Sequence, residues 1–326
     1  MGINGTDKKD IEKVSRYWDE HVKLHGESSV SVNWLESPLV HDCCLKNLQV
    51  GDKLLSISQW VLWVKEKYVP SGMNYGLSFG CGDGSLERQA ILSNICSKFD
   101  AYDISTKSIE IAKRLSEKEG LAACINYQAA DINNVLLDKD KYNIIFVGAA
   151  MHHFSNLEHI LKELRKSLKP NGLLILLEFV GPSKFQWTDK QLGIINELLK
   201  ILPERLKVDV RSGRLKEEVK RPSIKFMNET DPSEAIRSSD IIPLVYKMFN
   251  VEERIDFGGT ILHMLLDGII ANFNHKKEED VAILRFLGYV EDILIREKVL
   301  NSDFTLIVAK NTKSNSKNII RDETYG

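Results

Sequence analysis

The stretch NYGLSFGCGDGSLERQ, residues 74–89, decides the fold. In it, Gly80, Gly82 and Gly84 stand at every second position between an apolar run and a segment of helical character. Glycine tolerates a positive φ and lets a ligand approach the main chain closely. The free N–H groups at the start of the following helix favour an anionic group. This corner is therefore predicted to receive a close-fitting, negatively charged group.

From residue 74 onward, short apolar runs alternate with amphipathic helical patterns, which is typical of a parallel sheet with crossover helices. One helix is expected after Asn156, with Leu157, Leu161 and Leu168 on one face and an end at residues 169–172. Strands are expected at 75–79, 99–104, 125–129, 142–149, 173–179, 251–257 and 304–309.

This order of elements predicts an α/β fold with a doubly wound, seven-stranded, mostly parallel sheet of Rossmann-like type. The remaining segments lack strand alternation and are assigned by their helical patterns. The expected parts are an N-terminal helical cover (1–73), a cofactor-binding core (74–180), a helical insertion or lid (181–248), the last strands with a helical pair (249–310) and a mobile tail (311–326).

The composition of the chain argues against several classes of function. The 326 residues are 43% hydrophobic and 28% charged, with a formal net charge of -2, so no global field favours nucleic acid or an anionic membrane. No apolar run approaches the length of a membrane span, and the first ten residues are polar, so a cytoplasmic location is expected. The five cysteines lack paired spacing, and neither His21 with His25 nor the segment 41–44 suits a tetrahedral centre, so no metal site is expected.

Two classes of cofactor bind at such a glycine corner. The nicotinamide enzymes show GxGxxG, but here the third glycine comes one residue early and Ser85 takes the expected place. What remains is GxGxG followed by Asp103 at the end of the second strand, where a carboxylate can accept from two ribose hydroxyls. A nicotinamide oxidoreductase is thereby disfavoured.

On these residues the sequence resembles the class I S-adenosylmethionine-dependent methyltransferases, over roughly residues 74–180. LSFGCGDG resembles the family's first motif, QAADI its adenine-side acid, and NIIFVGAAMHHF and LKPNGLLILLEF its fourth and fifth strands. A narrower likeness is to bacterial members with an EFVGPSKFQW-like stretch. The resemblance implies S-adenosylmethionine as cofactor, S-adenosylhomocysteine as product, and contacts from Gly80, Cys81, Gly82, Gly84, Asp103, Ile104, Asp131 and Ile132.

One position departs from the family. Many members carry an acid two residues before the first glycine, and here Ser78 stands there. A serine cannot pair ionically with the ammonium group of the cofactor, so main-chain carbonyls of the loop would have to hold it.

Methyl transfer from a sulfonium needs alignment of the acceptor, exclusion of water and, for an ordinary hydroxyl or amine, a base. The candidates are His153 and His152 after the fourth strand and Glu178 at the end of the fifth. The alternative is that one histidine packs and the other caps the next helix, and His263 is expected to be a core residue. Tyr17, Trp18 and Trp187 are candidates for an aromatic cover, or for ordinary packing.

The predicted function is therefore methyl transfer to a small or medium-sized metabolite, with no nucleic acid or membrane partner. The alternatives are methylation of a protein or glycan, and a regulatory protein that binds the cofactor without turnover. The sequence predicts neither the acceptor nor the oligomeric state.

Overall fold

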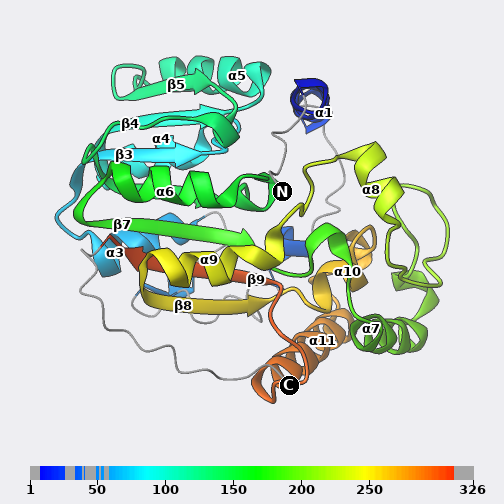
Figure 1. Cartoon of the computed structure of the whole chain (residues 1–326). Helices are drawn as coiled ribbons and strands as arrows, with labels where there is room; N and C mark the ends of the chain where they lie inside the picture. The colour runs from blue at the N-terminus through cyan, green and yellow to red at the C-terminus, as the bar shows by residue number, and fades with distance from the viewer. Residues whose placement is uncertain are drawn as a thin grey trace.

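A seven-stranded sheet forms the centre of the computed structural model, which describes residues 8–25, 34–38, 40, 49–50, 53–54 and 59–311 (Figure 1). Its strand order is β5-β4-β3-β6-β7-β9-β8. The first five of these strands run parallel, and β9 is antiparallel to both β7 and β8. The predicted Rossmann-like, mostly parallel sheet is thus confirmed, and its antiparallel strands lie at one edge. The strands are β3 Met73–Phe79, β4 Cys96–Asp103, β5 Ile125–Ala129, β6 Tyr142–Gly148, β7 Leu168–Phe179, β8 Asn250–Gly258 and β9 Phe304–Lys310, beside a small pair of β1 Gln49–Val50 and β2 Lys53–Leu54.

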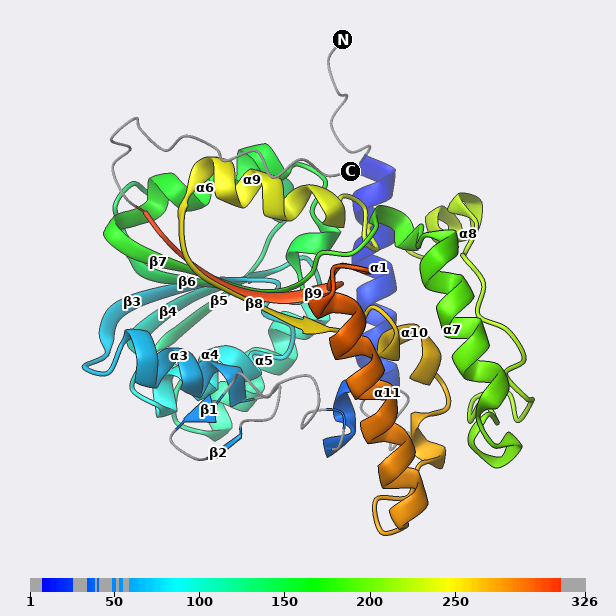
Figure 2. The same cartoon turned by 90° about the horizontal axis from the view of Figure 1, so that it is seen from below.

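Helices cover both faces of this sheet (Figure 2). Helices α3, α4 and α5 lie on one face, and α6 and α9 on the other. Helix α1 stands at the end of the sheet, and α7, α8, α10 and α11 gather beyond it. The helices are α1 Lys8–His25, α3 Trp60–Tyr68, α4 Ser85–Leu92, α5 Thr106–Lys118, α6 Leu157–Ser167, α7 Asp189–Ile201, α8 Ile224–Thr230, α9 Ile241–Met248, α10 Leu262–Leu266 and α11 Glu278–Arg296.

The two-sided cover explains the continuous apolar runs of the central strands. In β6, Ile144 and Phe146 pack with the helices of one face, and Ile145 and Val147 pack with those of the other. All four side chains are fully buried. Parallel strands covered on both faces carry such runs because successive side chains point to opposite faces.

The largest difference from the predicted strand boundaries lies at the start of β7, where α6 ends. Helix α6 ends at Ser167, and Leu168 already has the extended backbone of β7, so Leu168 is not on the helix face. Leu168 pairs with Tyr142, after which the register shifts and resumes at Ile144 and Leu173. The residues between form a bulge, which apolar periodicity could not reveal because Leu168 is buried in either conformation.

The helical parts form a third buried cluster beyond the strand ends, built around residues such as Ile195, Leu265 and Leu284. Helix α9 contacts α6 on the sheet, while α7 and α10 pack with each other. At the C-terminal side, Asn311 exchanges backbone hydrogen bonds with Asn171 and Gly172, and the rest of the expected tail, residues 312–326, lies outside the described residues. Within the described residues, no helix has the length and apolar character needed to cross a bilayer.

Candidate functional site

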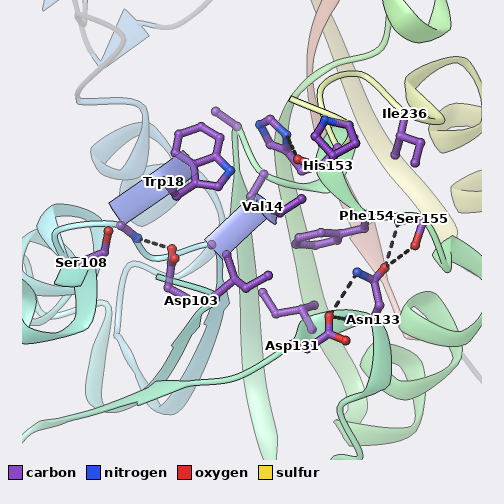
Figure 3. A pocket seen from close by; sticks show the side chains of 18 of the residues that line it. Val14, Trp18, Asp103, Ser108, Asp131, Asn133, His153, Phe154, Ser155 and Ile236 are labelled. Carbon is purple, nitrogen blue, oxygen red and sulfur yellow. Dashed lines mark hydrogen bonds between the residues drawn. The ribbon is translucent and has the colours of Figure 1, made fainter. Parts of the chain in front are cut away.

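A cavity of about 350 Å³ opens at the carboxyl ends of the parallel strands (Figure 3). Ligands of open α/β sheets bind at this edge, so the cavity lies where the strand order predicts a site. Seven of the predicted site residues line it: Gly80, Gly82, Asp103, Ile104, Asp131, Ile132 and His153. Four others, Cys81, Gly84, His152 and Glu178, are not among the lining residues. The structure thus brings seven of the predicted residues together in the wall of one cavity, and the other four do not line it.

The three glycines of the loop serve different purposes. All three have positive φ, between 52° and 76°. A Cβ on Gly80 would collide with Ala150, and one on Gly84, which caps α4, would collide with the Tyr127 hydroxyl. A Cβ on Gly82 would meet nothing within 4 Å. Packing therefore accounts for the missing side chains at Gly80 and Gly84, whereas the space above Gly82 is open for a ligand.

Asp103 fixes this loop to the end of β4. One carboxylate oxygen accepts from the Gly82 N–H at 2.9 Å, and the other accepts from the Ser105 N–H at 2.8 Å. Burial raises the pKa of Asp103, although the hydrogen bonds from Ser105 and Gly82 act against that rise. Each carboxylate oxygen has further lone pairs, so Asp103 can hold the loop and still accept from a hydroxyl of a ligand.

Asp131 and His153 lie at opposite ends of the cavity in Figure 3, with Phe154 between them on one side. Asp131 follows β5 and caps the short 3₁₀ helix Ile132–Asn134 by accepting from the Asn133 backbone N–H at 3.1 Å. The other carboxylate oxygen of Asp131 accepts from the Asn134 side chain. Asp131 is therefore oriented by its own turn.

Asn133 is a lining residue that the sequence did not indicate. Its Oδ1 accepts from the backbone N–H and the hydroxyl of Ser155 and from the backbone N–H of Asn156, at 2.9 to 3.1 Å. These bonds tie the loop after β5 to the start of α6 (Figure 3). A single asparagine carries no periodic signal, so only the fold reveals the contact.

Helix α1 covers part of the cavity with Val14 and Trp18. The Trp18 ring meets the His153 ring edge to face at a centroid distance of 5.0 Å. Asp19 anchors the helix by accepting from the Ser105 hydroxyl at 2.7 Å. Of the predicted aromatic cover, Trp18 lines the cavity, whereas Trp187 is buried elsewhere and donates to Asp303.

Glu178 is buried and joins the loop after β6 to β7. One oxygen accepts from the backbone N–H groups of Ala150 and Met151, and the other lies 2.8 Å from Nδ1 of His152. Burial opposes the charged form of His152, but the hydrogen bond and the charge of Glu178 outweigh it and raise the pKa of His152. Burial, with the nearby His152, holds the pKa of His153 well below its usual value.

A segment of the insertion packs against these histidines. The backbone N–H of Ile236 donates to the His152 carbonyl at 3.0 Å, and the Ala235 carbonyl accepts from the Lys184 N–H. Lys184 and Ala235 both have positive φ, 54° and 47°, as does Ala149 in the loop after β6, 52°. Such residues each store about 1–3 kcal/mol and gather at functional sites. His263, by contrast, is enclosed by aromatic rings and does not line the cavity.

Ser78, at the position where an acid was expected, is buried, and its hydroxyl has no hydrogen-bond partner among the described residues. Glu87 in α4 is fully buried, and neither of its carboxylate oxygens has such a partner. Burial raises the pKa of Glu87 to about 7, with the nearby Ser78 acting against the rise. A carboxyl group that the sequence did not indicate therefore lies beside Ser78, behind the glycine loop.

Comparison with known proteins matches residues 77–176 to a family described as a methyltransferase domain, which confirms the predicted family. A ubiquinone biosynthesis O-methyltransferase of Pelagibacter ubique is 25% identical over 53% of this chain and 65% of its own length. A malonyl-(acyl-carrier protein) O-methyltransferase of Halalkalibacterium halodurans is 33% identical over 37% of this chain and 47% of its own. The chain thus spans between about half and two thirds of the length of these relatives.

Two solved structures resemble most of the chain. The cyclase SpnF covers 96% of this chain and is itself covered completely, with a TM-score of 0.55 and 12% identity. A geranyl diphosphate C-methyltransferase from Streptomyces coelicolor, in complex with Mg²⁺ and S-adenosyl-L-homocysteine, covers 95%, with a TM-score of 0.54 and 10% identity. At such identities the likeness shows the fold alone, and the fold is the one that the sequence predicted.

Proposed function

We infer that this protein transfers a methyl group to a small or medium-sized acceptor. Its residues 77–176 belong to the class I S-adenosylmethionine-dependent methyltransferases. One observation carries this proposal. The open backbone at Gly82, the carboxylate of Asp103 and the imidazole of His153 all line one cavity. A cofactor site and a candidate proton acceptor therefore share one enclosed space.

The cofactor half of the cavity suits S-adenosylmethionine. By resemblance to the family, Gly80 and Gly82 would face its methionine part, Asp103 the ribose hydroxyls, and Asp131 with Ile132 the adenine. Bound there, the cofactor would supply an activated methyl group. The protein's own residues would hold it, orient the acceptor and exclude water, with Trp18 closing one side.

His153 is the candidate base that lines the cavity. The lowered pKa of its buried ring keeps it neutral at physiological pH, so a nitrogen lone pair is available to a proton. In this proposal Glu178 and His152 are positioning residues, because the hydrogen bonds of Glu178 fix the loop that carries both histidines.

The acceptor is proposed from the shape of the site. A cavity of about 350 Å³ at the edge of the sheet is in the range of small-molecule pockets. The named relatives are an O-methyltransferase of ubiquinone biosynthesis and a malonyl-(acyl-carrier protein) O-methyltransferase. Because SpnF has the same fold and is named as a cyclase, the fold by itself does not assign methyl transfer.

Calorimetry with S-adenosylhomocysteine tests the cofactor site. We expect saturable binding and a raised melting temperature, with no effect from NADH. Asp103→Asn removes a charged acceptor of hydroxyl hydrogen bonds and should weaken binding by about 10- to 100-fold. The exposed Asp138→Asn should bind as the wild type does. Equal affinity of Asp103→Asn and wild type would remove Asp103 from the site.

Incubation with radiolabelled S-adenosylmethionine and a metabolite extract tests turnover. We expect label to appear in a small-molecule fraction. Label in protein or glycan instead would favour those acceptors. Tight binding of S-adenosylhomocysteine without any transferred label would favour a regulatory binding protein.

A further inference from the structure

His152 and His153 turn their Nε2 atoms toward one carboxylate, that of Glu234 in the segment before α9. Nε2 of His152 lies 3.7 Å from one oxygen of Glu234, and Nε2 of His153 lies 3.9 Å from the other. A hydrogen bond between nitrogen and oxygen spans about 2.7–3.2 Å, so neither pair is hydrogen-bonded. Three groups that could bind one another directly are instead held slightly apart.

The partners of the other ring nitrogen fix the tautomer of His152. Glu178 is a carboxylate and can only accept, so Nδ1 of His152 is the donor in the bond of 2.8 Å between them. In the neutral ring this leaves a lone pair on Nε2, the atom that faces Glu234.

The same reasoning applies to His153. The Ser233 hydroxyl donates to Oδ1 of Asp231 at 2.6 Å, and this bond uses its only proton. Ser233 must therefore accept from Nδ1 of His153, which lies 3.2 Å away (Figure 3). Nε2 of His153 then also presents a lone pair to Glu234. Two lone pairs and a carboxylate repel one another unless a proton or a metal ion lies among them, and a metal ion can bind all three at once.

The surrounding charges also favour a cation. Three carboxylates, those of Glu178, Asp231 and Glu234, lie around the two histidines. Oδ2 of Asp231 is buried and accepts no hydrogen bond from any described residue. The nearby Lys184 donates to the Pro232 carbonyl at 2.5 Å and supplies one positive charge.

We propose that His152, His153 and Glu234 bind a divalent first-row transition-metal ion of the Zn²⁺ type. Two imidazoles and one carboxylate favour such ions over Mg²⁺ or Ca²⁺, which prefer oxygen ligands. The ligand atoms lie within 4.8 Å of one another. Ligands of tetrahedral Zn²⁺ are about 3.4 Å apart, so each of the two contacts with Glu234 would shorten by a few tenths of an ångström, and the two imidazole nitrogens would close from a separation of no more than 4.8 Å. Glu178 and Ser233 would orient the ligands from behind, as second partners of metal-bound histidines do.

Such an ion would join the loop after β6 to the insertion, which supplies Glu234. It would lie in the cavity wall, because His153, Pro232 and Ser233 line the cavity. Three protein ligands leave at least one coordination position open for an oxygen of a ligand. In a role that rests on the proposed function, the ion would then replace the His153 imidazole as the group acting on the acceptor.

The test is a titration of the chelator-treated, dialysed full-length protein with ZnCl₂ by calorimetry, with MgCl₂ and MnCl₂ in parallel. We expect one saturable Zn²⁺ per chain, a raised melting temperature, and weak or no binding of Mg²⁺. Co²⁺ in place of Zn²⁺ should give visible absorption bands characteristic of histidine and carboxylate ligands.

Glu234→Gln and His152→Ala should each reduce the affinity for Zn²⁺ at least tenfold and abolish the Co²⁺ bands. The matched controls, Glu229→Gln and His275→Ala, change exposed residues away from the cluster and should bind as the wild type does. Circular dichroism in the presence of chelator checks that each variant is folded.

Absence of saturable Zn²⁺ binding would overturn the proposal. So would full affinity in folded Glu234→Gln, because the ion would then be bound elsewhere. These results are independent of methyl transfer, since binding of S-adenosylhomocysteine is measured separately. A protein that binds S-adenosylhomocysteine but no Zn²⁺ would lose this inference and keep the proposed function.

Discussion

Replacement of Glu87 by glutamine tests the reasoning about the buried carboxyl behind the glycine loop. Glu87 is fully buried, and burial raises its pKa from 4.5 to about 7. Because the folded protein holds this proton more tightly than the unfolded chain, the folded state is favoured at low pH. The free energy of unfolding should therefore fall as the pH rises from about 4.5 to 7, and stay lowered above 7.

The magnitude follows from the two pKa values. One pKa unit is worth about 1.4 kcal/mol, so the loss of stability from Glu87 totals about 3 kcal/mol. Most of it, roughly 2.5 kcal/mol, falls between pH 5 and pH 8. For a chain of this length that corresponds to a change of roughly 4 °C in melting temperature. Glutamine does not titrate, so Glu87→Gln should lack this part of the pH dependence.

The assay is urea denaturation of wild type and Glu87→Gln at pH 5 and pH 8, followed by circular dichroism. The difference between the two proteins cancels the other titrating groups, including the buried Asp303. We expect Glu87→Gln to gain about 2.5 kcal/mol relative to wild type on going from pH 5 to pH 8. Glu110→Gln, an exposed change on α5, is the control and should follow the wild type. Parallel pH profiles for Glu87→Gln and wild type would refute the reasoning.

Two further predictions concern the cavity wall. Gly82→Ala places a methyl group in open space at the cavity and should weaken the binding of S-adenosylhomocysteine at least tenfold by calorimetry. The control is Gly213→Ala, which also has a positive φ and open surroundings but lies elsewhere, so it should lose only stability. Equal binding by both variants would mean that no ligand lies above Gly82. Asn133→Ala leaves three donors without their acceptor and should lower the free energy of unfolding by about 2–3 kcal/mol in urea. An unchanged free energy of unfolding would contradict the assigned bonds to Ser155 and the following residue.

Local patterns were enough to predict most of the fold. The alternation of short apolar runs and amphipathic helices located all seven strands of the large sheet. The signal was clearest for central strands such as β6, because parallel strands with cover on both faces are apolar throughout. The prediction was wrong at the junction of α6 and β7, where Leu168 is buried whether it is helical or extended. The hydrophobicity of a residue indicates that it is buried. For a residue that is buried in either conformation, it does not indicate whether the backbone is helical or extended.

Some features of the candidate site could likewise be predicted from the sequence, and others could not. Gly80, Gly82 and Asp103 could be proposed from sequence because they stand at strand ends, and the ends of parallel strands meet at one edge of a sheet. The roles of the three glycines could not be separated, since the Cβ clashes at Gly80 and Gly84 come from Ala150 and Tyr127 in other elements.

The sequence alone determined the sheet, the edge at which ligands bind and the family to which residues 77–176 belong, because each depends on neighbours along the chain. Only the tertiary structure decided what surrounds the two histidines. Glu234 and the adjacent Ser233 lie some 80 residues beyond them, and Glu178 comes from β7. Contacts between such distant residues depend on the fold of the insertion, and no local periodicity encodes them.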